Sequence, residues 1–235
     1  MQIQDKIALV TGASRGIGRA MTIALAEAGA HLAVTARNES LLAQTVTEIR
    51  SFKRNAMTYI GDMRDETAIK TLVQQTIDTF GRLDILINNA GVAHFSNIAD
   101  MKTSDWDEMF NLNMRGVFLL TRECLPYLRH GGESVVVNVA SLAGKNTFIG
   151  GGGYTATKHA LRAFSQCLML EERKHGVRIL SICPGSVATN FGGKAEGDQR
   201  DSITQPEDVA ASVLHMIQLP QRAMVSEIDI RPTNP

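Results

Sequence analysis

The hydrophobic positions of the chain fall into short runs, rich in valine and isoleucine, that alternate with segments of helical periodicity. Seven runs predict strands: Ile7 to Val10, Leu32 to Val34, Met57 to Ile60, Ile85 to Ile87, Val135 to Val139, Ile179 to Ile182 and Ile228 to Ile230. Nearly continuous apolar strands must be covered on both faces, and parallel strands need crossover connections. The pattern therefore predicts an α/β fold built on a doubly wound parallel sheet.

The segments between the predicted strands carry helix signals at their ends. Residues Glu39 to Phe52 keep apolar side chains at helical spacing, and Asn38 is placed to cap the first turn. Thr204 and Glu207 have the spacing of a capping box, which predicts where the last helix begins. Residues 185–203 hold glycines and charged residues with few apolar anchors. They are predicted to form a mobile loop beside the substrate.

Length and charge narrow the class of protein. The 235 residues fit one domain, 1–235, and 24 basic residues balance 24 acidic ones. A balanced chain lacks the electrostatic footprint of a nucleic-acid or anionic-membrane binder, so neither partner is expected. The charged amino-terminal residues and the absence of a long apolar segment argue against a signal peptide or membrane span and predict a cytoplasmic protein. The cysteines and histidines show no ligand spacing, so no metal site is expected.

A glycine-rich turn, Thr11 to Gly18, follows the first predicted strand and leads into an apolar helix. Gly12 permits a tight turn, Gly16 lets the backbone approach a pyrophosphate, and Gly18 allows the helix to pack closely on the sheet. The amino terminus of the helix then faces the phosphate charge. The turn predicts a dinucleotide cradle, and a glycine turn of purely structural use is the alternative.

The residues after the second predicted strand indicate which dinucleotide binds. An NAD-binding unit places a carboxylate about 20 residues after the turn, where it accepts hydrogen bonds from the adenosine ribose. This chain has Arg37 at that place, and a guanidinium pairs with the 2′-phosphate that distinguishes NADP. Arg15 in the glycine-rich turn is a second cation. We therefore expect NADP(H), against the alternative that both arginines are solvated surface charges.

Four polar residues are candidates for the chemistry. Tyr154 and Lys158 lie four residues apart and would share one helix face, where an ammonium would lower the phenol pKa from its usual value of about 10. Ser141 follows the fifth strand at the sheet edge where ligands bind, so its hydroxyl is placed to polarise a carbonyl. Asn113, in an apolar helical segment, either satisfies local backbone groups or holds a water that passes protons to Lys158.

These motifs occur together, in the order glycine-rich turn, Asn88 to Gly91, Asn113, Ser141, Tyr154 with Lys158, and Pro184 to Thr189. Over essentially its whole length the chain resembles the short-chain dehydrogenase/reductase family, in its single-domain NADP-preferring branch, and is similar to 3-oxoacyl-acyl-carrier-protein reductases. The resemblance implies a Rossmann-type, three-layer α/β/α fold with a seven-stranded parallel sheet. It also implies a homodimer or homotetramer that associates through the helices at 103–129 and 152–175.

The resemblance further implies a role for each site residue. Tyr154 would be the general acid and base, Lys158 would lower its pKa and bind the nicotinamide ribose, and Ser141 would orient the carbonyl. Asn113 would belong to a proton relay. The cofactor-binding residues would be Gly12, Ser14, Arg15, Gly16, Ile17, Gly18, Arg37, Asp62, Met63, Asn89, Ala90, Gly91, Tyr154, Lys158, Pro184, Gly185, Val187 and Thr189.

The combined interpretation is an NADPH-dependent oxidoreductase that reduces a ketone or aldehyde to an alcohol, reversibly. A 3-oxoacyl thioester is one candidate substrate. The substrate pocket would include Phe95, Phe148, Ile149 and Phe191, which favours an apolar or mixed ketone. The rival interpretation is a catalytically idle NADP-binding protein that senses redox state or serves as an assembly subunit, because a fold alone does not prove activity.

Overall fold

The computed structural model describes residues 1–193 and 203–233. All seven predicted strands are present, each somewhat longer than its apolar run. They are β1 (Ile7–Thr11), β2 (His31–Ala36), β3 (Ala56–Ile60), β4 (Ile85–Asn88), β5 (Ser134–Val139), β6 (Val177–Pro184) and β7 (Glu227–Ile230).

The segments that connect the strands are helical. The α-helices are α1 (Gly16–Glu27), α2 (Glu39–Ser51), α3 (Glu66–Phe80), α4 (Thr103–Phe110), α5 (Val117–His130), α6 (Gly152–Glu172) and α7 (Pro206–Gln218). A π-helical turn, η2 (Asn111–Gly116), joins α4 to α5. Short 3-10 turns are η1 (Ile98–Asp100), η3 (Leu142–Gly144), η4 (Arg173–His175) and η5 (Phe191–Gly193).

The two predicted helix caps have different outcomes. The Asn38 carboxamide oxygen accepts a hydrogen bond from the backbone N–H of Leu41 at 3.0 Å, as predicted. The cap predicted at Thr204 is wrong, because Gln205 is the N-cap of α7 and Asp208 completes the capping box. Thr204 instead forms an extended backbone bridge with Val187. The residue before a proline avoids helical geometry and a proline favours the first helical position, so the helix begins one residue later than predicted.

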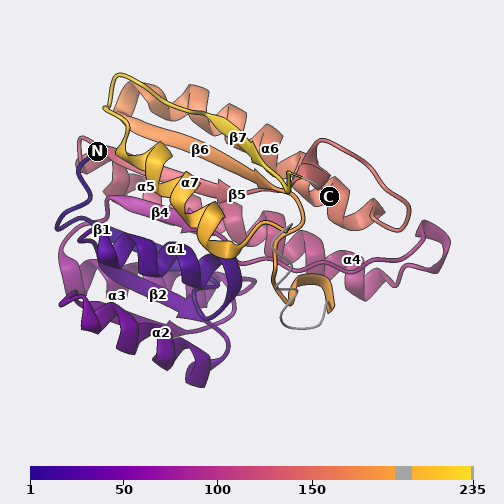
Figure 1. Cartoon of the computed structure of the whole chain (residues 1–235), viewed down its shortest axis with the longest axis horizontal. Coiled ribbons are helices and arrows are strands. Elements are labelled where there is room, and N and C mark those ends of the chain that lie inside the picture. The colour runs from indigo at the N-terminus through magenta and orange to yellow at the C-terminus, as the bar shows by residue number, and fades with distance from the viewer. Residues whose placement is uncertain (194–202, 234–235) are drawn as a thin grey trace.

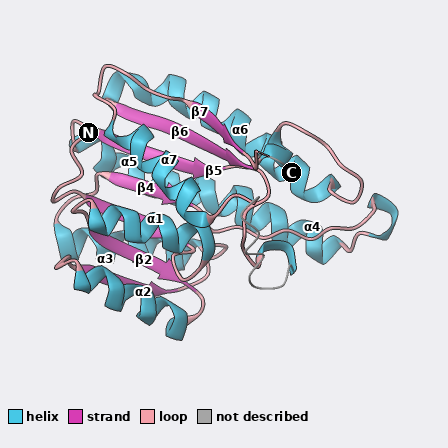
Figure 2. Ribbon diagram, viewed as in Figure 1, coloured by secondary structure: helices cyan, strands magenta, loops and turns pink. Residues whose placement is uncertain are grey.

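The strands form one parallel sheet in the order β3-β2-β1-β4-β5-β6-β7. The chain builds outward from β1 to β3 and then returns to place β4 on the other side of β1. Figure 1 shows α1 and α7 in front of the sheet, and Figure 2 shows the strands as one twisted layer between helices. This is the predicted Rossmann-type, three-layer α/β/α fold.

Alternate side chains of each central strand enter opposite cores. In β1, Ala8 and Val10 pack with α1, α2 and α7, whereas Ile7 and Leu9 pack with α3, α5 and α6. Both faces of the sheet are buried, which explains why the strands are apolar at consecutive positions. Because the rigid sheet is buried on both faces, the turns at its carboxyl edge hold fixed positions relative to one another.

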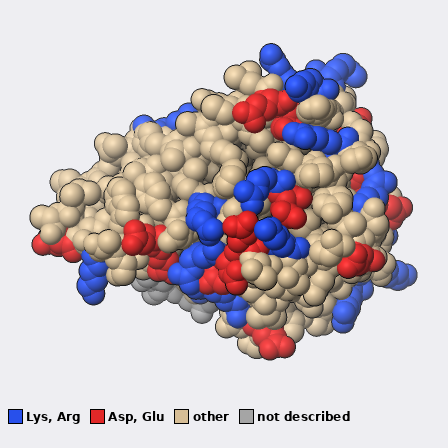
Figure 3. Space-filling model, turned by 180° about the vertical axis from the view of Figure 1, so that it is seen from behind, with Lys and Arg blue, Asp and Glu red and all other residues tan. Residues whose placement is uncertain are grey.

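The surface carries both signs of charge. Figure 3 shows basic and acidic side chains interspersed on the face seen from behind, beside a broad uncharged area. None of the helices that the structure describes is long and apolar enough to cross a bilayer.

Candidate active site

A large cavity lies at the carboxyl edge of the sheet, where the turns after β1, β2, β4, β5 and β6 meet. Its volume is about 960 Å³. The sheet changes its direction of winding between β1 and β4, and open α/β sheets bind ligands at such a switch point. All eighteen residues predicted to bind the cofactor line this one cavity, as do Ser141, Phe95, Phe148 and Phe191. Ile149, also predicted for the substrate pocket, does not line it and is exposed to solvent.

The glycine-rich turn packs so closely, and bends so sharply, that residues with side chains would not fit at its glycine positions. Gly12 and Gly16 have positive φ angles of 66° and 54°, which favour glycine. A Cβ atom at Gly18 would lie 2.2 Å from the Gly12 carbonyl oxygen and 2.3 Å from the Asn89 side chain. The turn therefore requires its glycines, and it presents backbone N–H groups at the start of α1, which is the donor set that a pyrophosphate needs.

Asn89 connects this cradle to the turn after β4. Its side-chain nitrogen donates to the carbonyl oxygens of Thr11 and Gly12 at 2.9 and 3.2 Å. In return, the Thr11 hydroxyl oxygen accepts hydrogen bonds from the backbone N–H groups of Asn89 and Ala90, both at 3.0 Å. These reciprocal bonds fix the distance between the two turns that would enclose a dinucleotide.

Arg15 and Arg37 both line the cavity. Both are exposed, and neither forms an ion pair with any residue that the structure describes. An unpaired guanidinium beside a pocket is available to a ligand anion.

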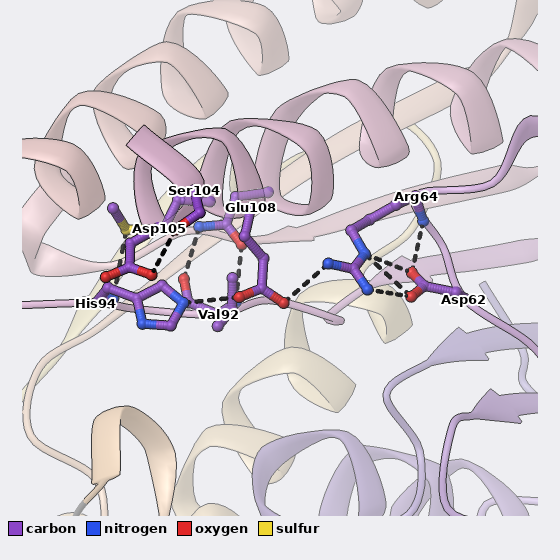
Figure 4. Close-up of polar contacts among 9 residues, drawn as sticks. Asp62, Arg64, Val92, His94, Ser104, Asp105 and Glu108 are labelled. Carbon is purple, nitrogen blue, oxygen red and sulfur yellow. Dashed lines mark hydrogen bonds and ion pairs between the residues drawn. The ribbon is translucent and has the colours of Figure 1, made fainter. Parts of the chain in front are cut away.

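Asp62, predicted to contact the adenine, begins a chain of polar contacts that continues through Arg64 and Glu108 to His94 (Figure 4). Arg64 binds both Asp62 carboxylate oxygens, at 2.6 to 3.0 Å, and holds the pKa of Asp62 below its ordinary value. The same guanidinium donates to Glu108 at 2.9 Å, and Glu108 lies 2.8 Å from His94 Nε2. The contact between Arg64 and Glu108 was not predicted, since the two residues are 44 positions apart in the chain.

Tyr154, Lys158 and Ser141 converge at the middle of the cavity. Tyr154 and Lys158 lie one turn apart on α6, as predicted, and are 8% and 5% exposed. The Lys158 ammonium donates to the carbonyl oxygen of Val139 at 2.7 Å and lies 5.7 Å from the centre of the Tyr154 ring. Ser141 caps η3 by accepting a hydrogen bond from Ala143 N–H at 3.1 Å.

Burial controls the titration of the tyrosine and the lysine. It raises the pKa of Tyr154 to about 12, and a hydrogen bond with Ser141 opposes this rise. Burial also lowers the pKa of Lys158 to about 8. The prediction that Lys158 lowers the pKa of Tyr154 is therefore wrong for this structure: the ammonium points to Val139, and desolvation of the phenolate is the larger effect. Tyr154 is held as a phenol, the form that can donate a proton.

Asn113 lies in the π-helical turn, is buried, and is not among the residues that line the cavity. Its carboxamide accepts from Val92 N–H and donates to the Val92 carbonyl, both at 2.9 Å. It also donates to the Thr157 hydroxyl at 3.1 Å. Asn113 does satisfy backbone groups, the first of its two predicted uses. A Cβ atom at Gly91 would meet both Asn113 Oδ1 and Lys158 Nζ, at 3.2 and 3.9 Å, so the glycine keeps these groups close.

A second ion cluster fixes the turn that carries Ser141. Arg162, one helical turn beyond Lys158, donates to both carboxylate oxygens of Glu227 at 2.7 and 3.0 Å and to the Gly144 carbonyl at 2.7 Å. Lys145 binds Glu227 at 2.7 Å. These contacts lower the pKa of Glu227 to about 2. The cluster was not predicted, because it joins β7 to α6 and η3 across the fold.

The predicted substrate loop at 185–203 is described only in part. Residues 185–193 and 203 belong to the structure, and Pro184, Gly185, Val187 and Thr189 line the cavity as predicted. The predicted mobility falls mainly on residues 194–202, which lie outside the described residues.

The sheet has the Rossmann-type strand order, and its glycine-rich turn lines the same cavity as a tyrosine, a lysine and a serine. This combination is typical of nucleotide-dependent enzymes. Sequence comparison identifies the family. The model of the short chain dehydrogenase family matches residues 6–200. An uncharacterised oxidoreductase of Staphylococcus saprophyticus is 33% identical over 99% of both chains. A glycine betaine reductase of Emericella nidulans is 32% identical over 98% of this chain, which covers 19% of that protein.

Solved structures agree with the sequence relatives. An alcohol dehydrogenase from the archaeon Thermococcus sibiricus, complexed with 5-hydroxy-NADP, matches with a TM-score of 0.94 and 28% identity, over 99% of this chain and 98% of that one. A metagenomic short-chain oxidoreductase in complex with NADP matches with a TM-score of 0.87 and 30% identity over the whole of both chains. The chain belongs to the short-chain dehydrogenase family of oxidoreductases.

Proposed function

We propose that the protein is an NADPH-dependent oxidoreductase that reduces a ketone or aldehyde to an alcohol, reversibly. One observation carries the proposal: the buried Tyr154 phenol and the Ser141 hydroxyl line the same cavity as the glycine cradle. A proton donor and a nucleotide site in one pocket are the two parts that carbonyl reduction needs.

The residues of the chain divide the work of the reaction. When bound, the nicotinamide supplies the hydride, or accepts it in the reverse direction. Ser141 holds the substrate carbonyl oxygen, and Tyr154 donates its phenolic proton to that oxygen as the carbonyl is reduced. With a pKa of about 8, Lys158 is mainly protonated at neutral pH, and in this proposal it binds the nicotinamide ribose. Asn113 serves the resupply of protons to the site.

The preference for NADP rests on Arg15 and Arg37, which line the cavity without ion-pair partners among the described residues. The Thermococcus sibiricus enzyme and the metagenomic relative are complexed with NADP-type ligands. The glycine cradle holds the pyrophosphate in this proposal, and the two arginines bind the 2′-phosphate.

Replacing Arg37 with aspartate is expected to weaken NADPH binding roughly 10- to 100-fold, because a charge-assisted hydrogen bond is lost and a carboxylate now faces the phosphate. NADH binding should be unchanged or tighter. Isothermal titration with both cofactors measures the change. Arg222→Asp is the matched control, since Arg222 is exposed and lies outside the cavity. An unchanged ratio of NADPH to NADH affinity in the Arg37 variant would contradict the assignment.

Assembly and location are further parts of the proposal. We propose one catalytic unit, 1–235, in the cytoplasm, acting as a homodimer or homotetramer with the helices at 103–129 and 152–175 in its interfaces. Trp106 on α4 and Leu170 on α6 support this arrangement, since both are large apolar side chains exposed to solvent.

Turnover is tested with a panel of ketones, aldehydes and a 3-oxoacyl thioester, with NADPH consumption followed by absorbance. The proposal expects substrate-dependent oxidation of NADPH and recovery of the alcohol. Tight NADPH binding without turnover of any panel member would instead support the rival function, a redox sensor or assembly subunit.

A further inference from the structure

Three phenylalanine rings gather around the catalytic tyrosine, and we call Phe95, Phe148 and Phe191 the ring cluster. Phe95 meets Tyr154 edge-on, with ring centres 5.8 Å apart and an interplanar angle of 85°. Phe191 lies 5.7 Å from Tyr154 on a tilted plane. Phe148 contacts Phe95 at 5.7 Å, also edge to face. The rings come from three separate segments, which follow β4, η3 and β6, so the fold assembles them at the site.

The ring cluster is incompletely buried, unlike the tyrosine it surrounds. Phe95, Phe148 and Phe191 are 49%, 47% and 39% exposed, whereas Tyr154 is 8% exposed. All three line the cavity. Scattered exposed apolar residues need no explanation, but a contiguous apolar surface beside a pocket marks a binding site. The cluster therefore offers free ring surface to whatever lies next to the Tyr154 hydroxyl.

Glycines leave the space in which the rings lie. A Cβ atom at Gly151 would lie 2.6 Å from the Phe148 ring, and one at Gly192 would lie 2.7 Å from the Phe95 ring. A larger residue at either position would force a ring to move. The rings are thus placed by their backbone surroundings, which limits the conformational freedom they would lose when a substrate binds.

Among the described residues, Lys158 is the cavity cation that lies beside the ring cluster, 5.7 Å from the centre of the Tyr154 ring. The cavity cations in that part of the chain are Arg15, Arg19, Arg37, Lys158 and Arg231. The first three belong to the glycine-rich turn, α1 and the end of β2. Lys158 is bonded to Val139, and Arg231 is paired with Asp229 at 3.3 Å. Lys158 is thus held by a backbone carbonyl and is assigned to the nicotinamide ribose, and His94, next to Phe95, lies 2.8 Å from Glu108. The described residues beside the rings therefore include no cation without a partner for a carboxylate or phosphate of the substrate.

We propose that the substrate is an uncharged ketone or aldehyde with an aromatic ring attached to the carbonyl carbon. The inference rests on the proposed carbonyl reductase function. Because the ring cluster contacts the residue that protonates the carbonyl oxygen, a ring adjacent to that carbonyl packs edge to face on Phe95 and Phe148. The carbonyl carbon gains a hydride as NADPH is oxidised to NADP⁺, and the oxygen takes the proton of Tyr154, which yields an aryl carbinol.

The test compares acetophenone with cyclohexyl methyl ketone, which has similar size but no aromatic ring. Conjugation makes acetophenone the less reactive carbonyl, so a preference for it must come from the protein. We expect kcat/KM with NADPH to favour acetophenone in the wild-type enzyme. Phe95→Leu and Phe148→Leu should each reduce this preference roughly threefold to tenfold, the range for one edge-to-face contact. Phe80→Leu, an aromatic substitution outside the cavity, should leave it unchanged.

The outcomes separate this inference from the proposed function. A wild-type preference for cyclohexyl methyl ketone, or a preference that neither ring substitution changes, overturns the aromatic assignment while carbonyl reduction stands. Failure of every carbonyl compound to oxidise NADPH overturns the proposed function and the inference with it. NADPH titration of each variant checks that it is folded, and the use of two independent ring variants keeps the test decisive if one of them does not fold.

Discussion

Tyr154→Phe is expected to lower kcat for carbonyl reduction by about 10²- to 10⁴-fold, the usual contribution of a positioned general acid. The variant loses one oxygen atom and keeps the ring that packs against Phe95 and Phe191. NADPH affinity and the free energy of unfolding should therefore change little. Steady-state kinetics, isothermal titration and denaturant unfolding measure the three quantities.

Tyr59→Phe is the matched control for this substitution, because Tyr59 lies on β3 and does not line the cavity. It should leave kcat unchanged. Since the pKa of Tyr154 is raised to about 12, the wild-type residue stays protonated across the ordinary pH range and the acid remains available. If Tyr154→Phe retained more than about a tenth of wild-type kcat, general acid catalysis by this residue would be excluded.

Lys158→Met is expected to stabilise the cofactor-free protein at pH 7 while removing activity. Burial lowers the pKa of Lys158 in the folded protein to about 8, from an ordinary value of 10.5, so the unfolded chain holds this proton more tightly than the folded one. The charged group therefore costs folding free energy at pH 7, and that cost disappears as the pH rises from about 8 to 10.5. After subtraction of the lost bond to Val139, we expect a gain of roughly 1 to 3 kcal/mol.

Denaturant unfolding at pH 7 and at pH 10.5 measures this effect. The advantage of Lys158→Met should be present at pH 7 and absent at pH 10.5. Lys102→Met, at an exposed lysine before α4, should have no such pH-dependent effect. A Lys158→Met variant with a lower free energy of unfolding than wild type at pH 7 would contradict the expected cost of burying this charge.

The sequence predicted the parts of the fold that depend on local patterns. Apolar runs located the strands because both faces of the sheet are buried, and Asn38 capped its helix because the interaction spans only three residues. The cap at Thr204 failed for an equally local reason: the following Gln205-Pro206 pair delays the helix. The glycine-rich turn was predictable because its close contacts require residues without side chains.

Pairs that are distant in the chain were not predictable in the same way. Arg64 meets Glu108, and Arg162 meets Glu227, only after the fold has formed. The pKa of Tyr154 depends on burial, which a spacing of four residues does not report, and so the predicted direction was wrong. The phenylalanines were placed in the pocket from the sequence, but the ring contacts of Phe95 and Phe191 with Tyr154, and of Phe148 with Phe95, needed the structure.

The most direct test of the account follows a labelled hydride. The protein is incubated with NADPH deuterated at the transferable position of the nicotinamide and with acetophenone or another ketone of the panel, and the alcohol is examined by mass spectrometry and NMR. The account predicts one deuterium on the carbinol carbon of the product, and its rate of appearance should fall by about 10²- to 10⁴-fold in Tyr154→Phe. Binding of labelled NADPH with no labelled alcohol from any member of the panel would contradict it.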